Sequence, residues 1–136
     1  MPDVELSAIG GKTIEEWDRL WVPVDGGLKF DQPKLRHQVG LYRVSLKGQI
    51  MAIGTGVGKR GGLAKRLSDF RRDSSSARDH FAGLLIDENL GRLEVKVLIT
   101  GSDRTAREFA QQLKSPMMRL HTPGWNATNA PYMREG

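Results

Sequence analysis

The sequence contains no cysteine and only three histidines among its 136 residues. The absence of cysteine excludes disulfide frameworks, thiolate zinc sites and cysteine nucleophiles. His37, His80 and His121 lie about forty residues apart, without a paired spacing such as H-x-x-x-H, which argues against a metal site built from several histidines. Any metal bound by this chain is therefore expected to be a hard cation with oxygen ligands.

Long apolar runs are also missing. No stretch approaches the ~20 residues that cross a bilayer, and the first residues lack the basic and then apolar layout of a secretory signal. We therefore expect no membrane partner and a cytoplasmic location. The length is typical of one domain, and a hydrophobic share of 38% with 16 glycines is typical of a globular chain.

Basic residues exceed acidic ones by 21 to 16, and the excess is partly local. Between residues 58 and 72 there is one acid, Asp69, and six bases: Lys59, Arg60, Lys65, Arg66, Arg71 and Arg72. Such a cluster can be a solvated helix face, or it can bind phosphates through arginine side chains and the N–H groups of a glycine-rich loop. A nucleotide P-loop is disfavoured, because Arg60 stands where the Ser or Thr after Gly-Lys is required.

Periodicity predicts an α+β fold in the order ββααβα: a short three-stranded antiparallel sheet flanked by helices, with an N-terminal helical extension. The expected strands are 40–46 and 49–54, joined by a Lys47-Gly48 turn, and 92–100. The expected helices are 13–21, 63–72, a third from residues 74–76 to 89, and a last one from Asp103 or Thr105 to the residue before Pro116. In the third strand, Leu93, Val95, Val97 and Ile99 are expected on the buried face.

The helix expected at 63–72 carries an arginine on its apolar side. The stripe of Leu63, Leu67 and Phe70 also passes through Arg66, so the guanidinium is predicted to point along the side that faces the sheet. A cation there needs a partner. Two interpretations remain open: an ion pair with an acid of the last helix, or a cation at the rim of a cleft that receives a phosphate.

Several short motifs occur in an order that resembles the GIY-YIG nuclease family. They are Gly-Leu-Tyr at 40–42, Ala-Ile-Gly at 52–54, a glycine-rich link, the helix segment LAKRLSDF with its arginine, a third strand, and a last helix that carries Glu108. The resemblance covers about residues 40–126. It implies a domain over 40–126, preceded by an extension at 1–39 and followed by a tail at 127–136.

The resemblance implies a divalent-metal-dependent endonuclease that hydrolyses phosphodiester bonds of DNA. By that resemblance Tyr42 activates the attacking water, Arg66 steadies the phosphate, Glu108 holds Mg²⁺ or Mn²⁺, and Asn126 supports the site. One carboxylate ligand would leave Mg²⁺ mostly hydrated and able to bridge a phosphate oxygen. The remaining bases of the cluster are then expected to contact DNA: Lys59, Arg60, Lys65, Arg71 and Arg72.

One departure from the family pattern opens an alternative function. Ala52 stands in place of the second tyrosine, which indicates a catalytically degenerate GIY-YIG-fold protein that binds nucleic acid without nuclease activity. Ala52→Tyr should be tolerated if the alanine leaves an empty slot. A two-residue turn would also pair Tyr42 with Ile53, so a bulge is needed to bring Tyr42 and Ala52 to one face.

Each candidate also has an interpretation without catalysis. Tyr42 can be ordinary strand packing, Glu108 can form a capping box with Thr105, and Asn126 can be a turn residue. Trp17 and Trp21 are expected in the core or at an interface, which leaves open a homodimer or an adaptor that binds a nucleotide or a protein.

Overall fold

The computed structural model describes residues 8–28, 32–59, 61–71 and 89–125. Its elements in chain order are α2 (Ile14–Asp18), β1 (Val22–Pro23), the 3₁₀ helix η1 (Pro33–Leu35), β2 (Val39–Leu46), β3 (Gln49–Gly56), α3 (Gly62–Arg71), the 3₁₀ helix η2 (Leu90–Arg92), β4 (Glu94–Gly101) and α6 (Arg104–His121). The helix predicted from residues 74–76 to 89 falls largely outside the described residues, as do Arg60, Arg72, Asn126 and the tail.

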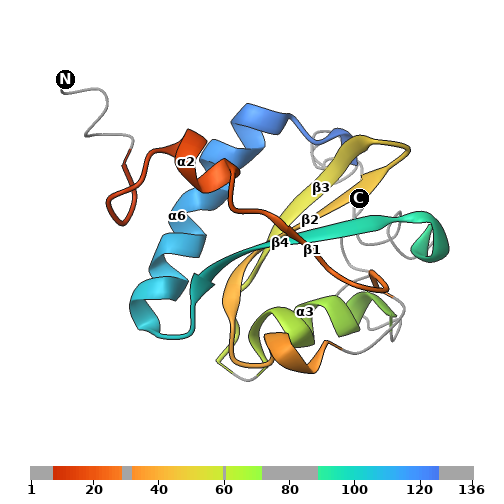
Figure 1. The fold of residues 1–136 in the computed structure, drawn as a ribbon, viewed down its shortest axis with the longest axis horizontal. Coiled ribbons are helices and arrows are strands. Elements are labelled where there is room, and N and C mark those ends of the chain that lie inside the picture. Colours follow the sequence, from red (N-terminus) through yellow and green to blue (C-terminus); the bar gives the residue numbers. More distant parts are fainter. Residues whose placement is uncertain (1–7, 29–31, 60, 72–88, 126–136) are drawn as a thin grey trace, which may run out of the picture.

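The sheet is antiparallel and has four strands in the order β1-β4-β2-β3 (Figure 1). The α+β class is confirmed, but the prediction of three strands was wrong. The extra strand comes from the N-terminal extension, where Val22 and Pro23 pair with Val97 and Lys96 of β4. Two residues are too few to show alternation, and a proline without an N–H group fits only an edge strand. The sequence therefore gave no strand signal there.

The β2–β3 hairpin contains the bulge that the motif spacing requires. Beside the turn, Ser45 pairs with Ile50, whereas Val44 pairs with Ala52, so Met51 is the extra residue. Beyond the bulge Tyr42 pairs with Gly54. Tyr42 and Ala52 therefore lie on the same face of the sheet, as the resemblance demands.

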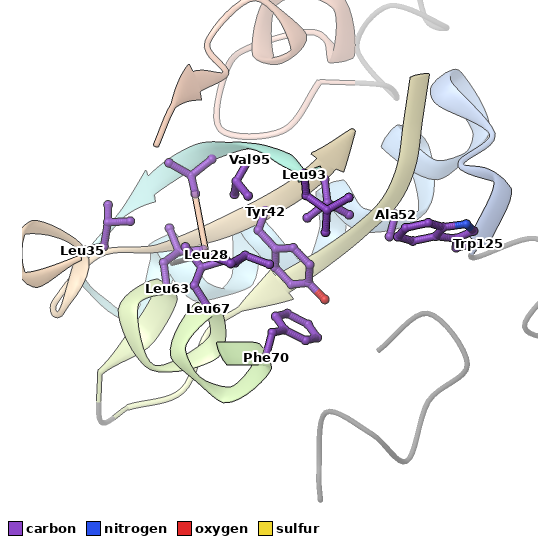
Figure 2. Packing of buried hydrophobic residues seen from close by; sticks show 12 residues of the cluster. Leu28, Leu35, Tyr42, Ala52, Leu63, Leu67, Phe70, Leu93, Val95 and Trp125 are labelled. Atoms are coloured by element: carbon purple, nitrogen blue, oxygen red, sulfur yellow. The ribbon is translucent and has the colours of Figure 1, made fainter. Parts of the chain in front are cut away.

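Helices cover both faces of the sheet (Figure 1). On the α3 face the buried cluster, drawn in Figure 2, contains Leu28, Leu35, Tyr42, Val44, Ala52, Leu63, Leu67, Phe70, Leu93, Val95, Val97 and Trp125. On the α6 face it contains Trp17, Trp21, Leu41, Ile53, Leu98, Leu113 and Met117. The predicted α3 stripe and the expectation of two core tryptophans are both confirmed. Ile99, expected to be buried, is 36% exposed, so the buried part of β4 on the α3 face ends at Val97.

Helix α6 begins at the first of its two predicted starts but ends later than predicted. Its N-cap is Asp103, whose carboxylate accepts a hydrogen bond from the Ala106 N–H at 2.8 Å, so no capping role remains for Thr105. The helix also continues through Pro116 to His121. A proline removes one helix hydrogen bond, and the burial of Met117 against the sheet offsets that loss.

The N-terminal segment is attached to α6 by polar contacts. Helix α2 begins with the predicted capping box, in which Thr13 and Glu16 bond each other's backbone N–H. Asp18 then accepts from the Trp21 indole N–H at 2.9 Å and lies 2.6 Å from Nε2 of His121 at the end of α6. None of the described helices is long and apolar enough to cross a membrane.

Candidate nucleic-acid interface

Tyr42 and Arg66 come together on the α3 face of the sheet. Tyr42 lies on the inner strand β2 and is 6% exposed, with its ring edge-on to Phe70 at 5.4 Å. The guanidinium carbon of Arg66 is 5.9 Å from the centre of the Tyr42 ring and 4.9 Å from that of Phe70. The prediction that Arg66 points along the sheet is confirmed. An ion pair with the last helix is not formed, because α6 covers the opposite face.

The protonation of Tyr42 is controlled by this environment. Burial raises the pKa of the Tyr42 phenol, while the charge of Arg66 and a hydrogen bond from its guanidinium lower it by less. The hydroxyl is therefore protonated at neutral pH. A neutral phenol can donate or accept a hydrogen bond, but it is a weak base for activating water.

Alkaline titration tests the Tyr42–Arg66 contact. In a Tyr132→Phe background, where Tyr42 is the only tyrosine, we expect tyrosinate absorbance to appear above the usual pKa of about 10. Because the folded pKa is raised, the stability contributed by the buried neutral phenol is complete below about pH 10 and is lost as the pH rises through the folded pKa. Arg66→Gln should move the titration further upward, and Lys34→Gln should leave it in place. An unchanged titration in Arg66→Gln would contradict the contact.

The motif glycine Gly54 is explained by the same tyrosine. A Cβ built on Gly54 would lie 2.3 Å from the Tyr42 hydroxyl oxygen. Any side chain at this position would therefore displace the phenol from its place beside Arg66. The Ala-Ile-Gly motif thus has a packing role in this chain, whatever its chemistry.

The space beside Ala52 is filled. Ala52 is 2% exposed, and Figure 2 shows the Trp125 ring against it within the same buried cluster. The neighbouring Gly124 approaches Met51 of β3, since an added Cβ would lie 3.5 Å from the methionine methyl group. The idea of an empty tyrosine slot is therefore wrong for this chain, because the segment after α6 closes over it.

Ala52→Tyr is accordingly expected to destabilise the fold by about 3 kcal/mol, a cost typical of severe overpacking. Thermal unfolding should show a fall of about 10 °C in the melting temperature. Thr55→Tyr is the control, since it puts the same ring at a partly exposed position of the same strand. Equal melting temperatures for the two variants would show that Trp125 does not close this space.

Glu108 lies with a different set of residues from Tyr42 and Arg66. It is exposed on α6, and one carboxylate oxygen is 3.6 Å from Nε of Arg104, a surface pair of small energetic value. It also lines a hollow of about 380 Å³, here called the α6 hollow, formed by Lys59, Arg104, Arg107, Glu108 and Gln111. The structure thus brings Tyr42 to Arg66 but places Glu108 among cations.

This surrounding does not fit a divalent metal ion at Glu108. Three cationic side chains share the α6 hollow with a single carboxylate, and like charges repel a dication. Within the described ranges, moreover, no group of three or more His, Asp or Glu side chains could hold a metal ion. Mg²⁺ or Mn²⁺ at Glu108 stays a prediction from the resemblance, and the local charge favours an anion.

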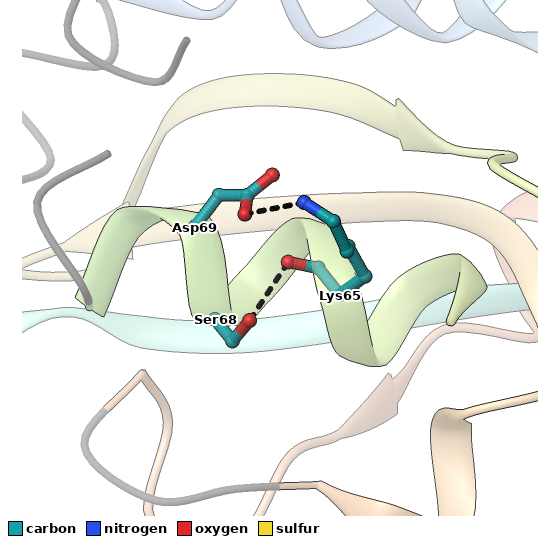
Figure 3. A network of polar contacts seen from close by, with 3 residues as sticks. All are labelled: Lys65, Ser68 and Asp69. Carbon is teal, nitrogen blue, oxygen red and sulfur yellow. Dashed lines mark hydrogen bonds and ion pairs between the residues drawn. The ribbon is translucent and has the colours of Figure 1, made fainter. Parts of the chain in front are cut away.

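The predicted DNA-binding bases have different surroundings. Lys59 is exposed and lines the α6 hollow. Lys65 is half-exposed, but its ammonium is 2.8 Å from the nearly buried carboxylate of Asp69 (Figure 3). This pairing reduces the attraction of Lys65 for a phosphate. The Arg71 side chain, Arg60 and Arg72 are outside the described part of the structure, so their role stays a prediction.

Two cations of this surface were missed by the sequence analysis. Arg104 and Arg107 occupy the first two turns of α6, and the first turn carries no acid. Bases at a helix N-terminus oppose the helix dipole, and the Asp103 carboxylate at the N-cap of α6 is the acid that counters them. The two arginines at the predicted start of this helix were the signal in the sequence that could have revealed this surface.

Comparisons of the chain with protein-family models, with characterised proteins and with solved structures found no match.

Proposed function

We propose that this chain binds the phosphate backbone of DNA through the surface formed by the loop after β3 and the start of α6. The α6 hollow carries the proposal: Lys59 from the loop meets Arg104 and Arg107 from the helix, and these three cations face one carboxylate. Arginine and lysine at a concave surface are the usual phosphate ligands of nucleic-acid-binding proteins.

The absence of nuclease activity is part of this proposal. Tyr42 is buried and protonated, Trp125 occupies the space beside Ala52, and Glu108 is paired with Arg104 among other cations. These observations support the catalytically degenerate form of a GIY-YIG-like domain.

DNA hydrolysis is the second candidate function, and the Tyr42–Arg66 contact favours it. An arginine beside a phenol is the pair that the resemblance requires for phosphate and water. A protonated phenol can still orient a water molecule, and the guanidinium can offset charge that develops on a phosphate.

A supercoiled-plasmid assay separates the two candidates. With Mg²⁺ or Mn²⁺ we expect retarded migration of intact plasmid, without nicked or linear product. Duplex, branched and single-stranded oligonucleotides should likewise be bound and left uncut. Metal-dependent cutting that is lost in Arg66→Ala and Glu108→Ala would favour the nuclease instead. Neither binding nor cutting would reject both functions.

A further inference from the structure

The α6 hollow is one of three hollows that share lining residues. A second hollow, here called the central hollow, is lined by Arg36, His37, Val39, Gly58, Lys59, Gly62, Ser102 and Arg107. A third lies between η1 and α3, with Arg36, His37 and Lys65 among its lining residues. Adjacent hollows share residues: Lys59 and Arg107 join the first two, and Arg36 and His37 join the last two. The three hollows are therefore neighbours on one surface, here called the groove.

The central hollow is where cations of three separate elements converge. Arg36 follows η1, Lys59 belongs to the loop after β3, and Arg107 lies on α6. The lining includes no carboxylate, and among ion pairs between described residues none involves these three side chains. Like charges gathered without an acid repel one another, so an anion bound between them would relieve the repulsion.

The N-terminus of α3 adds to this positive potential, and that of α6 lies beside it. Gly62 is the first residue of α3, and Ser102 directly precedes Asp103, the N-cap of α6; both residues line the central hollow. The N-termini of both helices therefore border the same small space. The first turn of α3 carries no acid, whereas the N-terminus of α6 is capped by the Asp103 carboxylate. The volume of about 60 Å³ is enough for one small anion.

The N-terminal extension is held in place to form one wall of this hollow. Leu35 is buried against the α3 side of the sheet, and the carbonyl of Gln38 accepts the Leu63 N–H at 2.9 Å. At Gly62 the approach is so close that an added Cβ would lie 2.3 Å from that same carbonyl oxygen. Arg36 and His37 are consequently fixed beside the start of α3.

We propose that the central hollow binds one phosphate group of the nucleic acid, held by Arg36, Lys59 and Arg107, with the His37 imidazole as a further donor. The identity of the ligand rests on the proposed function. Residues 32–38 then have a defined role: they supply ligands that the region resembling GIY-YIG domains does not contain. A phosphate bound here determines the path of the nucleic-acid strand between the α6 hollow and Lys65.

Inorganic phosphate is the probe for this site, followed by NMR of the backbone amides in the full chain. We expect saturable shifts at Gly58, Gly62 and Ser102, and displacement of the phosphate by a short DNA duplex. Arg36→Gln and Arg107→Gln should each weaken phosphate binding about tenfold, since each removes a charge-assisted contact. Arg119→Gln, an exposed arginine at the other end of α6, is the control with the same loss of charge.

The possible outcomes test the phosphate site separately from the proposed DNA binding. Phosphate shifts spread over the whole basic surface, or equal effects of Arg36→Gln and Arg119→Gln, would overturn the site even if DNA binds elsewhere. Saturable phosphate binding at the central hollow without any DNA binding would support an anion site while rejecting the proposed function. Folding of each variant is checked by its amide spectrum away from the groove.

Discussion

Gly40→Ala is expected to lower the free energy of unfolding by about 3 kcal/mol or more, as severe overpacking does. Gly40 lies near the start of the inner strand β2, opposite Ile99 of β4. A Cβ built on Gly40 would lie 1.9 Å from the carbonyl oxygen of Leu98 and 2.9 Å from its carbonyl carbon. Because the obstacle is backbone of a paired strand, no side-chain rotation can relieve it.

Urea unfolding measures this effect, with Gly48→Ala as the control. Gly48 is in the hairpin turn with a positive φ of 82°, and a Cβ there would meet no atom within 4 Å. Its replacement costs backbone strain only, about 1 kcal/mol. Equal losses for Gly40→Ala and Gly48→Ala would show that β2 and β4 are not packed this closely. The presence of glycine at the first position of the Gly-Leu-Tyr motif would then need another explanation.

Combined replacement of Lys59, Arg104 and Arg107 by glutamine is expected to weaken DNA binding about 100-fold at moderate salt. The estimate assumes about 1 kcal/mol for each lost phosphate contact. The effect should be the same for unrelated DNA sequences, because contacts to the phosphate backbone carry no base information. Fluorescence anisotropy with two short duplexes of different sequence provides the measurement.

The matched control replaces Arg19, Lys47 and Arg119, which are exposed cations away from the groove. Both triple variants have the same net charge, so a long-range effect of total charge would weaken binding equally in the two. We expect only a small change in the control. If the control loses as much affinity as the groove variant, binding depends on overall charge and not on this surface.

The elements that are marked by a local pattern of residue types were predictable. Alternation predicted β2, β3 and β4, and the Leu63, Leu67 and Phe70 stripe predicted α3 together with the inward direction of Arg66. The capping spacing of Thr13 and Glu16 predicted the start of α2. These features depend on neighbours within a few residues, which the sequence displays directly.

The parts that depend on distant contacts were not predictable. Strand β1 has only two residues and exists because β4 offers an open edge. Trp125 packs near Ala52, although more than seventy residues separate them in the sequence. Helix α6 passes Pro116 because the sheet buries the residue that follows. In each case tertiary packing outweighs a local signal.

Of the candidate residues, the buried pair was predictable and the converging cations of the surface were not. The Tyr42–Arg66 contact followed from the resemblance and from the helix stripe. The convergence of Arg36, Lys59 and Arg107 did not, because the three residues belong to separate segments that meet only in the fold. The six basic residues that lie between residues 58 and 72 in the sequence are therefore only part of the basic surface.

The most direct test of DNA binding by this surface is the salt dependence of the dissociation constant for a short duplex. For the parent we expect log Kd to rise linearly with log salt, with a slope of about 2.7 or more for at least three phosphate contacts. The Lys59, Arg104 and Arg107 triple variant should lose about 2.7 of that slope, and the Arg19, Lys47 and Arg119 control should retain it. A parent that binds with a flat salt dependence, or a groove variant with the parent's slope, would contradict the proposed function.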